Sequence, residues 1–478
     1  MLGGATNTTM RVLVGNSWAE IMGASPSFLD AITRHLAVSL GDDATSAKVG
    51  HRFGALFWAM HQGERSLWGS LLHERRRVAS GLVPWVEALA RHYREPVEIV
   101  EYRKRPECEL PMWSISGVAW RPYQDTVQKQ ILIHDRGVVA APPRSGKTLM
   151  AARAFDAIAQ PCLWLVPSLA IGRQTYMVLK KHFGPDFVAR LDGEATKDER
   201  DIEKRLVVAT IQSALSQSPE WFKTRRMLVI DEFHHAAAES YHRLNALCEH
   251  VYYRLCWTGT HFRTGEDALA MHAICSTVLH KIEFDDLVAE GFLAPARVLF
   301  MQPRVRAPVF TDNRWMQVYQ SGIVEWAPRN EMAAFTARTL DASGIPTIVL
   351  TRRRAHAEAL SKMIPGSQVV LGGDGALLSR AISDFNDGVT NVLVGTQVIG
   401  EGVDVPRAAA LVYAAGGNEG VQQMQSYYRP LTAFPGKEIG LIYDFLDSHH
   451  GMLAGHARSR QRITAEMLGE KALVKVPR

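Results

Sequence analysis

Short apolar segments alternate with helix-forming segments along most of the chain, and this alternation limits what the chain can fold into. Between residues 118 and 260, runs such as GVVAA, CLWLV and RMLVI end in small or polar residues. The same pattern restarts after residue 296 with runs such as TIVL and NVLVG. Such runs are typical of parallel strands that are buried on both faces of a sheet. We therefore predict an α/β fold with two tandem parallel-sheet lobes, residues 116–295 and 296–478.

The first 115 residues follow a different pattern, which predicts a small α+β domain. Residues 10–15 and 96–103 are rich in valine and isoleucine and predict strands. Residues 25–39 predict a helix, because Pro26 suits a first turn and apolar residues recur at helical spacing. A second helix is predicted over residues 81–93. The expected order is this N-terminal domain, residues 1–115, followed by the two lobes.

The composition agrees with a globular protein of several domains. Hydrophobic residues make up 47% of the 478 residues and charged residues 22%, which excludes a disordered, collagen-like or disulfide-scaffold chain. The net charge is +5, and many basic residues occur in clumps. Each clump, taken alone, is typical of a solvated face, so nucleic-acid binding is expected only if other motifs require it. The clumps are at residues 75–77, 103–105, 225–226 and 352–354, and at Arg458, Arg460 and Arg462.

The cysteines show no metal-binding or disulfide pattern. Cys108, Cys162, Cys248, Cys256 and Cys275 form no CxxC pair and lie near no paired-histidine motif. The sequence therefore predicts free thiols, as is usual in a reducing cytoplasm. No apolar run reaches the length of about 18 residues that a membrane helix needs. We expect a cytoplasmic protein that has no membrane partner.

The segment AAPPRSGKT, residues 140–148, is the sharpest motif in the chain. It matches the phosphate-loop pattern G-x-x-x-x-G-K-[ST] at Gly146, Lys147 and Thr148, with Ala141 in place of the first glycine. Backbone N–H groups of residues 145–148 can hold phosphate at the start of a helix, and the lysine can reach the β- and γ-phosphates. The threonine hydroxyl can hold Mg²⁺. The alternative is an ordinary strand, turn and helix.

A second motif, MLVIDEFHH, places two carboxylates at the end of a predicted strand. Asp231 can hold Mg²⁺, and Glu232 can act as a base toward a hydrolytic water. The alternative is an acidic pair at the surface. Because open α/β sheets bind ligands at the carboxyl ends of their strands, the two motifs together favour a nucleotide site.

In this order the motifs resemble those of superfamily 2 helicases, over about residues 118–447. DEFH at residues 231–234 is similar to the DExH signature, and RPYQ at residues 121–124 is similar to the Q motif. Further similar segments are VPSLAIGRQ (motif Ia), ATIQSAL (Ib), WTGT (III), TIVLTRRRAHAEAL (IV) and LVGTQVIGEGVDVPRA (V). The resemblance implies two RecA-like lobes, ATP and Mg²⁺ as cofactors, and ATP hydrolysis coupled to movement on DNA or remodelling of DNA.

The resemblance also implies a role for each matching residue. Catalysis is expected from Lys147, Asp231, Glu232 and Arg429. Nucleotide contacts are expected from Arg121, Gln124, Arg144, Ser145, Gly146, Lys147, Thr148, Gly402 and Asp404. Metal contacts are expected from Thr148 and Asp231. Nucleic-acid contacts are expected from Ser168, Arg173, Thr210, Gln212, Arg352, Arg353 and Thr396.

The chain departs from the family pattern at two places. Arg144 replaces a glycine of the phosphate loop, so the loop geometry can differ. The motif VI pattern is Q-x-x-G-R-x-x-R, and its alignment on Arg429 puts Gln425 and Ser426 where the glycine and arginine would be. Three readings follow: hydrolysis is slow, Arg429 alone is a sufficient arginine finger, or Arg407 contributes.

Residues 80–107 carry a further resemblance, to the domain that precedes the motor in phage UvsW-type and XPB-like DNA helicases. The resemblance implies a DNA contact by this domain, and the alternative is a domain that only packs on the first lobe. DNA, branched, double-stranded or single-stranded, is favoured over RNA as the partner, and a monomer is expected. The other functions left open are the motor of a restriction-type system, an ATP-dependent nucleic-acid clamp with weak turnover, and an RNA helicase.

Overall fold

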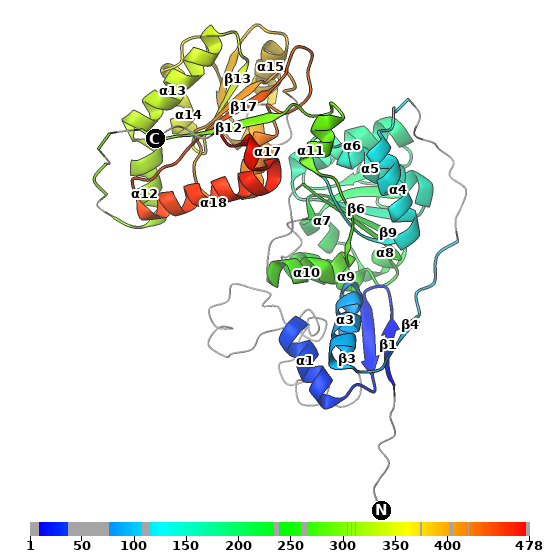
Figure 1. Ribbon diagram of the computed structural model, residues 1–478. Helices are drawn as coiled ribbons and strands as arrows, with labels where there is room; N and C mark the ends of the chain where they lie inside the picture. Colours follow the sequence, from blue (N-terminus) through cyan, green and yellow to red (C-terminus); the bar gives the residue numbers. More distant parts are fainter. Residues whose placement is uncertain are drawn as a thin grey trace, which may run out of the picture. The chain divides into compact units, whose positions relative to one another are not determined.

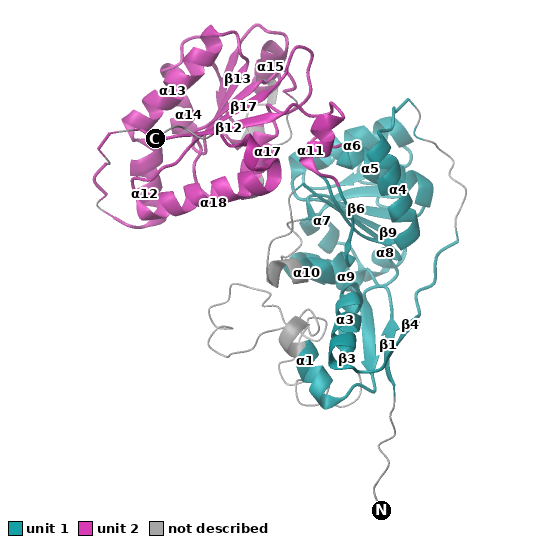
Figure 2. Ribbon diagram, in the orientation of Figure 1, with its two compact units in different colours: residues 1–141, 146–281 teal, residues 142–145, 282–478 magenta. Residues whose placement is uncertain are grey.

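The computed structural model divides the chain into two compact units (Figure 2). Unit 1 comprises residues 1–141 and 146–281, and unit 2 comprises residues 142–145 and 282–478. The structure describes residues 9–36, 76–107, 115, 117–233, 239–259, 266–303, 305–306, 308–310, 312–372, 375–400, 405–418 and 420–474. Within these ranges, every helix is too short or too polar to span a bilayer.

A small mixed sheet opens unit 1 and confirms the predicted α+β fold of the N-terminal segment (Figure 1). Its strand order is β3-β2-β1-β4, with β1 parallel to β4 and antiparallel to β2. Val12, Ile21 and Val78 of the sheet pack on Phe28 of α1 and Val86 of α3. The elements are β1 (Met10–Val14), β2 (Trp18–Met22), α1 (Pro26–Leu36), β3 (Arg76–Ala79), the 3-10 helix η3 (Ser80–Leu82), α3 (Val83–Tyr93) and β4 (Val97–Glu101). We call residues 9–36 and 76–101 the N-terminal module.

The rest of unit 1 is built on a parallel sheet of seven strands in the order β11-β5-β10-β9-β6-β8-β7. The central strands are buried along their whole length, as their continuous apolar runs predict. The strands are β5 (Arg136–Ala140), β6 (Cys162–Val166), β7 (Val188–Leu191), β8 (Leu206–Thr210), β9 (Met227–Ile230), β10 (Tyr253–Thr258) and β11 (Val278–Lys281). The helices are α4 (Pro122–His134), α5 (Lys147–Ile158), α6 (Leu169–Phe183), α7 (Ile211–Leu215), α8 (Pro219–Lys223), α9 (Glu239–Leu247) and α10 (Glu266–Cys275).

Unit 2 contains a second parallel sheet, with six strands in the order β12-β17-β16-β13-β15-β14. The predicted second lobe is therefore confirmed as an α/β layer. The strands are β12 (Ala296–Met301), β13 (Thr347–Leu350), β14 (Gln368–Val370), β15 (Val392–Gly395), β16 (Ala410–Tyr413) and β17 (Gly440–Phe445). The helices are α11 (Phe284–Ala289), α12 (Trp315–Tyr319), the π-helix η5 (Gln320–Val324), α13 (Ala327–Ala342), α14 (Arg354–Lys362), α15 (Gly375–Asn386), α16 (Gln397–Gly400), α17 (Gly420–Tyr427), α18 (Gly451–Leu468) and the 3-10 helix η6 (Glu470–Ala472).

Two buried arginines join the N-terminal module to the first parallel sheet. Arg136 and Arg254 occupy paired positions on the neighbouring strands β5 and β10, near the amino ends of those strands. The Arg136 guanidinium donates to Ser80 Oγ at 2.7 Å and to the Asn16 carbonyl at 3.0 Å, and Arg254 donates to Ser17 Oγ at 2.9 Å. Burial lowers the pKa of Arg254 to about 10, because the charged guanidinium loses its hydration. The hydrogen bonds to the module offset part of this desolvation cost. The module therefore packs on the sheet edge that is opposite the carboxyl ends of the strands.

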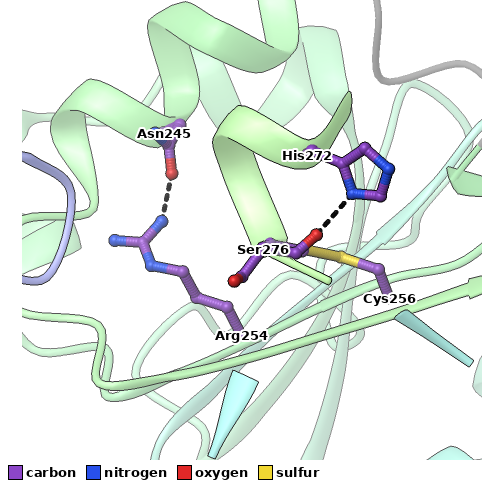
Figure 3. Close-up of a disulfide and its surroundings, with 6 residues drawn as sticks. Asn245, Arg254, Cys256, His272 and Ser276 are labelled. Atoms are coloured by element: carbon purple, nitrogen blue, oxygen red, sulfur yellow. Dashed lines mark hydrogen bonds between the residues drawn. A yellow bond between two sulfur atoms is a disulfide. The ribbon is translucent and has the colours of Figure 1, made fainter. Parts of the chain in front are cut away.

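Two sequence predictions are wrong. Cys256 of β10 and Cys275 of α10 form a disulfide, although all cysteines were expected as free thiols (Figure 3). Their spacing matches no motif, and they meet because α10 packs on β10; Cys162 and Cys248 are free and buried. Two arginines of the basic clumps are also buried, not solvated: Arg225 is 2% exposed and Arg460 is 1% exposed. Carbonyl groups of residues 202 and 204 accept from Arg225, and carboxylates of unit 2 pair with Arg460.

Candidate functional site

The two sharpest motifs meet at the carboxyl edge of the first parallel sheet. Strands β5, β10 and β9 are neighbours in the sheet, and the phosphate loop follows β5 while Asp231 follows β9. The N–H of Ala141, at the start of the loop, donates to the Thr258 carbonyl at the end of β10 at 2.9 Å. The same edge therefore carries the phosphate loop, the first residues of the motif III segment and the acidic pair, as expected for a ligand site of an open α/β sheet.

The phosphate loop leads into α5 through two residues with left-handed backbone. Gly146, the residue before the helix, has φ +84°, and Arg144 has φ +71°. The arginine thus adopts the conformation that a glycine would favour, at a cost of about 1 kcal/mol. The replacement of the usual glycine has not removed the turn. The Ser145 hydroxyl is fully buried and donates to the Pro142 carbonyl at 2.7 Å, which closes the loop.

The amino end of α5 has no side-chain cap, unlike those of the next three helices along the chain. Ser168, Thr210 and Ser218 cap α6, α7 and α8 through their hydroxyl oxygens, whereas Gly146 offers no side chain to α5. The first N–H groups of a helix have no partner within the helix, and its dipole favours an anion there. This end of α5 is therefore suited to hold phosphate through its backbone.

Gln124 of the Q motif lies directly against the phosphate loop. Its side chain is 4% exposed, its Oε1 accepts from the Arg121 N–H at 3.0 Å, and Arg121 also donates to the Tyr123 hydroxyl at 2.8 Å. A Cβ atom on Gly146 would lie only 2.8 Å from Gln124 Nε2. The backbone angle therefore favours glycine at position 146, and a Cβ there would displace the Gln124 amide.

The lysine of the phosphate loop forms an ion pair with the acidic motif. Lys147 Nζ lies 3.4 Å from Glu232 Oε1, and both side chains are largely buried. Asp231 Oδ1 accepts from the N–H of Glu232 at 2.9 Å, and Glu232 has a left-handed backbone with φ +48°. Strained backbone of this kind often occurs at functional sites. Lys147 thus balances part of the negative charge of the acidic pair.

Asp231 is a buried carboxylate whose ionised form is unfavourable without a neighbouring positive charge. Burial, followed by the negative charge of Glu232, raises the pKa of Asp231 to about 6, while Lys147 opposes the shift. A divalent cation beside this carboxylate would favour its ionised form. Carboxylate and hydroxyl oxygens are suitable ligands for Mg²⁺, so Asp231 and Thr148, in the first turn of α5, fit the predicted metal role.

The predicted nucleic-acid residues of unit 1 lie at the carboxyl ends of β6 and β8 or in the helices that follow them. Ser168 Oγ accepts from the Ile171 N–H at 3.4 Å, and Thr210 Oγ1 accepts from the Ser213 N–H at 3.4 Å. Both hydroxyls therefore have a structural task as helix caps. Arg173 is exposed and pairs with Glu194 at 2.7 Å, and Gln212 is exposed.

In unit 2 the predicted nucleic-acid residues also follow parallel strands. Arg352 and Arg353 are exposed after β13, and Arg353 Nη2 lies 3.4 Å from Met316 Sδ. Thr396 is half-buried after β15, and its N–H donates to the Val370 carbonyl at 3.3 Å. The predicted nucleotide residues Gly402 and Asp404 lie outside the described residues.

The degenerate motif VI forms α17 and the turn that follows it. Arg429 is half-buried, and its N–H donates to the Ser426 carbonyl at 3.1 Å. Ser426 is 1% exposed and donates to the Gln422 carbonyl one turn earlier at 2.7 Å, while Gln425 is half-buried. The position at which the family pattern has an arginine therefore faces the interior of unit 2.

Arg407, the alternative arginine finger, has a structural task. Its guanidinium donates to the carbonyls of Phe385 at 3.0 Å and Thr390 at 3.2 Å and to Asn391 Oδ1 at 2.9 Å. These three hydrogen bonds tie it to the connection between α15 and β15.

Sequence reasoning missed a cluster of buried charges that joins α13 and α18 to the end of β17 and contacts α17. Arg329 and Arg460 form ion pairs with Asp444 and Asp447, and all four side chains are at most 1% exposed. The one signal in the sequence was YDF at the end of a predicted apolar strand, where an aspartate is out of place unless it is paired.

Comparison with known proteins finds a family model and relatives that match part of this chain. The family model for the type III restriction enzyme res subunit matches residues 117–263. A putative DNA 3'-5' helicase Rad25 of Haloarcula marismortui is 25% identical over 309 residues, which are 62% of this chain and 47% of that protein. The Rad25 protein of Halobacterium salinarum is 26% identical over 353 residues, with coverage of 72% and 56%. The chain thus spans about half the length of these relatives.

Solved structures give the same fold. A fragment of a putative HsdR subunit of a type I restriction enzyme from Vibrio vulnificus superposes with a TM-score of 0.55 at 17% identity. The match covers 77% of this chain and 68% of that fragment. Identity at this level establishes the fold alone, namely tandem parallel-sheet lobes in one chain.

Proposed function

We propose that this chain is a superfamily 2 motor that couples ATP hydrolysis to movement on DNA or remodelling of DNA. One observation carries the proposal: Lys147, Glu232 and Asp231 are grouped at the carboxyl edge of a parallel sheet that also presents the uncapped amino end of α5. Phosphoryl transfer needs these parts, namely N–H donors and a lysine for phosphates, a carboxylate for a metal ion and a base for water. The names of the Rad25 relatives support DNA as the partner.

Each residue of this group has a proposed task. Lys147 would bind the β- and γ-phosphates, and Thr148 and Asp231 would hold Mg²⁺, which neutralises phosphate charge when it is bound. Glu232 would accept the proton of the attacking water. Because Lys147 pairs with Glu232 at 3.4 Å, a nucleotide that draws the ammonium toward phosphate would leave Glu232 a stronger base. The ion pair would thus restrain the base until nucleotide arrives.

Arg429 is the proposed arginine finger. It is the arginine of motif VI that the alignment retains, and Ser426 is buried at the other arginine position. An arginine finger stabilises negative charge that develops in the transition state, so its effect falls on kcat more than on ATP affinity. Gly402 and Asp404 of motif V, together with Arg121, Gln124, Arg144, Ser145 and Gly146, complete the proposed nucleotide contacts.

A steady-state ATPase assay tests the proposal. Turnover is measured without nucleic acid and with single-stranded, duplex and forked DNA, and with RNA of the same sequence. We expect several-fold stimulation by DNA, and no turnover in Lys147→Ala. Turnover that is negligible under all conditions, together with tight ATP-dependent DNA binding, would favour the clamp. Stimulation by RNA alone would favour an RNA helicase.

The motor of a restriction system is a second candidate, favoured by the res-subunit match and by the HsdR fold. Among the described residues there is no group of three or more His, Cys, Asp or Glu side chains that could hold a metal ion. Incubation of supercoiled plasmid with the protein and Mg·ATP separates the candidates. A motor alone consumes ATP and leaves the plasmid intact, whereas cleavage would identify a restriction enzyme.

A further inference from the structure

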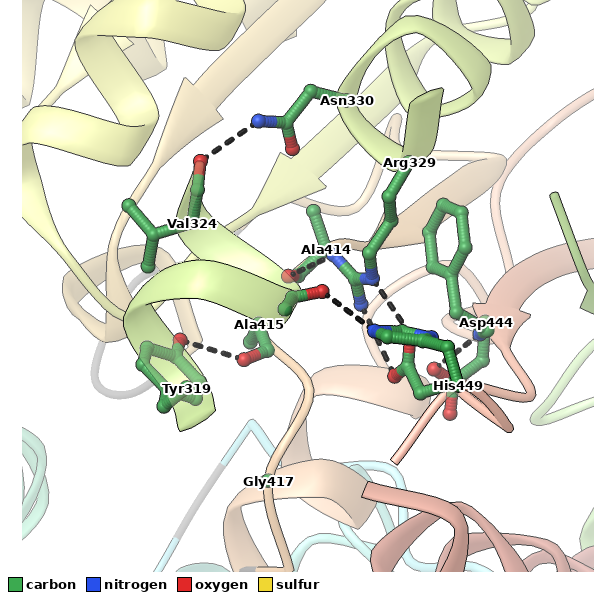
Figure 4. Close-up of polar contacts among 12 residues, drawn as sticks. Tyr319, Val324, Arg329, Asn330, Ala414, Ala415, Gly417, Asp444 and His449 are labelled. Carbon is green, nitrogen blue, oxygen red and sulfur yellow. Dashed lines mark hydrogen bonds and ion pairs between the residues drawn. The ribbon is translucent and has the colours of Figure 1, made fainter. Parts of the chain in front are cut away.

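Three backbone carbonyls in the segment between β16 and α17 accept hydrogen bonds from buried side chains of three other helices. Arg329 of α13 donates to the Ala414 carbonyl at 2.8 Å, and Tyr319 of α12 donates to the Ala415 carbonyl at 2.7 Å (Figure 4). Arg460 of α18 donates to the Gly417 carbonyl at 2.8 Å. We call residues 414–417 the clamped loop. It leads directly into the helix that carries motif VI.

The same two arginines bind two aspartates at the end of β17. Arg329 Nε lies 2.8 Å from Asp447 Oδ1, while Arg460 lies 2.8 Å from Asp444 Oδ2 and 3.1 Å from Asp447 Oδ2. Burial lowers the pKa of Arg460, but the charges of Asp444 and Asp447 outweigh burial and hold the pKa above its usual value. Two positive and two negative side chains thus balance each other inside unit 2.

A buried network of this kind is a poor way to gain stability. Four charges lose their hydration, and well-packed apolar side chains of the same volume are often equally stable or more stable. Asp447 adds a further cost, because its backbone has φ +44°, which is unfavourable for a residue with a side chain. What the network does provide is fixed geometry, since each donor has one set of acceptors at hydrogen-bond distance.

The network holds α17 at both ends. The clamped loop precedes the helix, and at its other end the Tyr427 hydroxyl donates to Asp444 Oδ2 at 2.6 Å, the same oxygen that pairs with Arg460. In the middle, Gln423 Nε2 donates to the Arg460 carbonyl at 3.2 Å. Arg429 follows two residues after Tyr427, so the backbone that aims Arg429 is fixed by Arg460 and its partners.

We propose that Arg460 is a positioning residue for catalysis, which acts by fixing α17 and thereby the direction of Arg429. The proposal rests on the proposed role of Arg429 as the arginine finger. The C-terminal helix α18 belongs to none of the helicase-like motifs, so this assigns a task in turnover to a residue outside them. It also gives a physical reason why a motif VI that lacks its first arginine can still present the second one.

Two variants of graded severity test the proposal, and an exposed neighbour serves as the control. Arg460 donates to four acceptors, namely Asp444, Asp447 and the carbonyls of Gly417 and Phe445. Arg460→Lys keeps the charge but cannot reach all four, and Tyr427→Phe removes a single hydroxyl from the network. Arg458→Gln, two residues away on the exposed face of α18, is the control. Turnover is expressed per nucleotide-binding site, titrated with a fluorescent ATP analogue, so that misfolded protein does not count.

We expect Arg460→Lys to lower DNA-stimulated kcat by between about tenfold and a hundredfold, as a small misplacement of a catalytic group can. Tyr427→Phe should lower kcat several-fold, and Arg458→Gln should leave it unchanged. KM for ATP should change by less than twofold in all three, because Arg429 acts in the transition state. Normal kcat per site in both Arg460→Lys and Tyr427→Phe would overturn the proposal.

A double variant separates positioning from general support of the fold. If Arg460 acts through Arg429, then Arg460→Lys should cost less than twofold in kcat once Arg429→Ala is present. Losses that multiply would overturn the proposal and leave the network a purely structural role. Absence of DNA-stimulated turnover in the wild-type protein would overturn the proposed function itself. Normal kcat in Arg429→Ala would overturn the finger, and this proposal with it.

Discussion

Lys147 and Glu232 form an ion pair across two strand ends of unit 1, with Nζ and Oε1 3.4 Å apart. The pair joins the phosphate loop to the acidic motif. Removal of either partner therefore changes the electrostatics of the other, and the two substitutions should have different signatures.

Lys147→Ala should abolish ATP turnover. It removes the charge that would bind the β- and γ-phosphates, and it leaves Asp231 and Glu232 without their neighbouring cation. Nucleotide affinity and turnover are measured by fluorescence titration and by ATPase assay. Lys129→Ala, at an exposed position of α4, is the control for loss of a lysine. Turnover like that of the wild type in folded Lys147→Ala would refute the assignment of the phosphate loop.

Glu232→Gln should separate binding from chemistry. The amide keeps the shape of the side chain but cannot accept the proton of the attacking water. The variant should bind ATP, fail to hydrolyse it and accumulate in an ATP-bound, DNA-bound state, which can be followed by retention of labelled ATP on DNA-bound protein. If Glu232→Gln instead loses ATP affinity as severely as Lys147→Ala, then Glu232 is not the base.

Arg429→Ala and Arg407→Ala should fail in different ways. Loss of the proposed finger should lower kcat at least about a hundredfold, or about 2.7 kcal/mol in activation free energy, with little change in ATP affinity. Arg407→Ala removes three hydrogen bonds within unit 2 and should lower the unfolding temperature while kcat per folded molecule stays near normal. The opposite pattern would make Arg407 the finger.

DNA binding should depend steeply on salt and little on sequence. Phosphate contacts release counterions, so log K against log[salt] should have a slope of about −0.9 for each phosphate contact. Arg352→Ala should reduce this slope by about one contact. Arg173→Ala should reduce it less, because Arg173 already pairs with Glu194 at 2.7 Å. Anisotropy titrations of labelled duplexes measure the slopes, and binding that is insensitive to salt would contradict a phosphate-driven interface.

Unit 2 should lose stability as pH falls from about 6.5, the usual histidine pKa. Burial, and secondarily the charge of Arg329, lowers the pKa of His356 to about 3, and its Nε2 lies 2.8 Å from Asn330 Oδ1. Below the usual histidine pKa, the unfolded chain takes up a proton that the folded chain refuses. The free energy of unfolding should therefore fall by up to about 1.4 kcal/mol per pH unit until the folded pKa is reached.

Calorimetry at several pH values between neutrality and mild acid checks this expectation. His356→Gln cannot take up the proton, so the transition of unit 2 should depend less on pH in this variant than in the wild type. His134→Gln, at an exposed position of α4, is the control. Identical pH dependence in wild type and His356→Gln would show that another group governs acid unfolding.

The strands of the first parallel sheet that were easiest to predict are those whose residues are nearly all apolar. CLWLV, LVVAT and MLVI are buried along their whole length, so no face had to be guessed. Strands β3 and β11 were missed, because RRVA and VLHK mix charged and apolar residues within four positions. The grouping of Lys147 with Glu232 was predictable, since the carboxyl ends of parallel strands share one edge.

The buried charges could not be predicted, because their burial depends on partners far away in sequence. Arg460 lies in the run ARSRQR, which is typical of an exposed helix face, and the carboxylates of Asp444 and Asp447 come from a different element. The Cys256–Cys275 disulfide follows from the packing of α10 and not from a motif. The burial of Arg136 and Arg254 also depends on distant partners, because their side chains are covered by the N-terminal module.

The packing of the N-terminal module on Arg136 and Arg254 limits how this chain can be shortened or recombined. The hydrogen-bond acceptors of Arg136 lie on Asn16 and Ser80, and Ser17 serves both Arg254 and the Asn245 carbonyl. A Cβ on Gly81 would collide with the backbone of residues 272–273, so the seam tolerates little remodelling. The N-terminal module and the first parallel sheet therefore form one structural unit that should be kept together. A chimera that exchanges the first parallel sheet between homologues would have to carry both, with the junction placed after residue 281 and not before the Q motif.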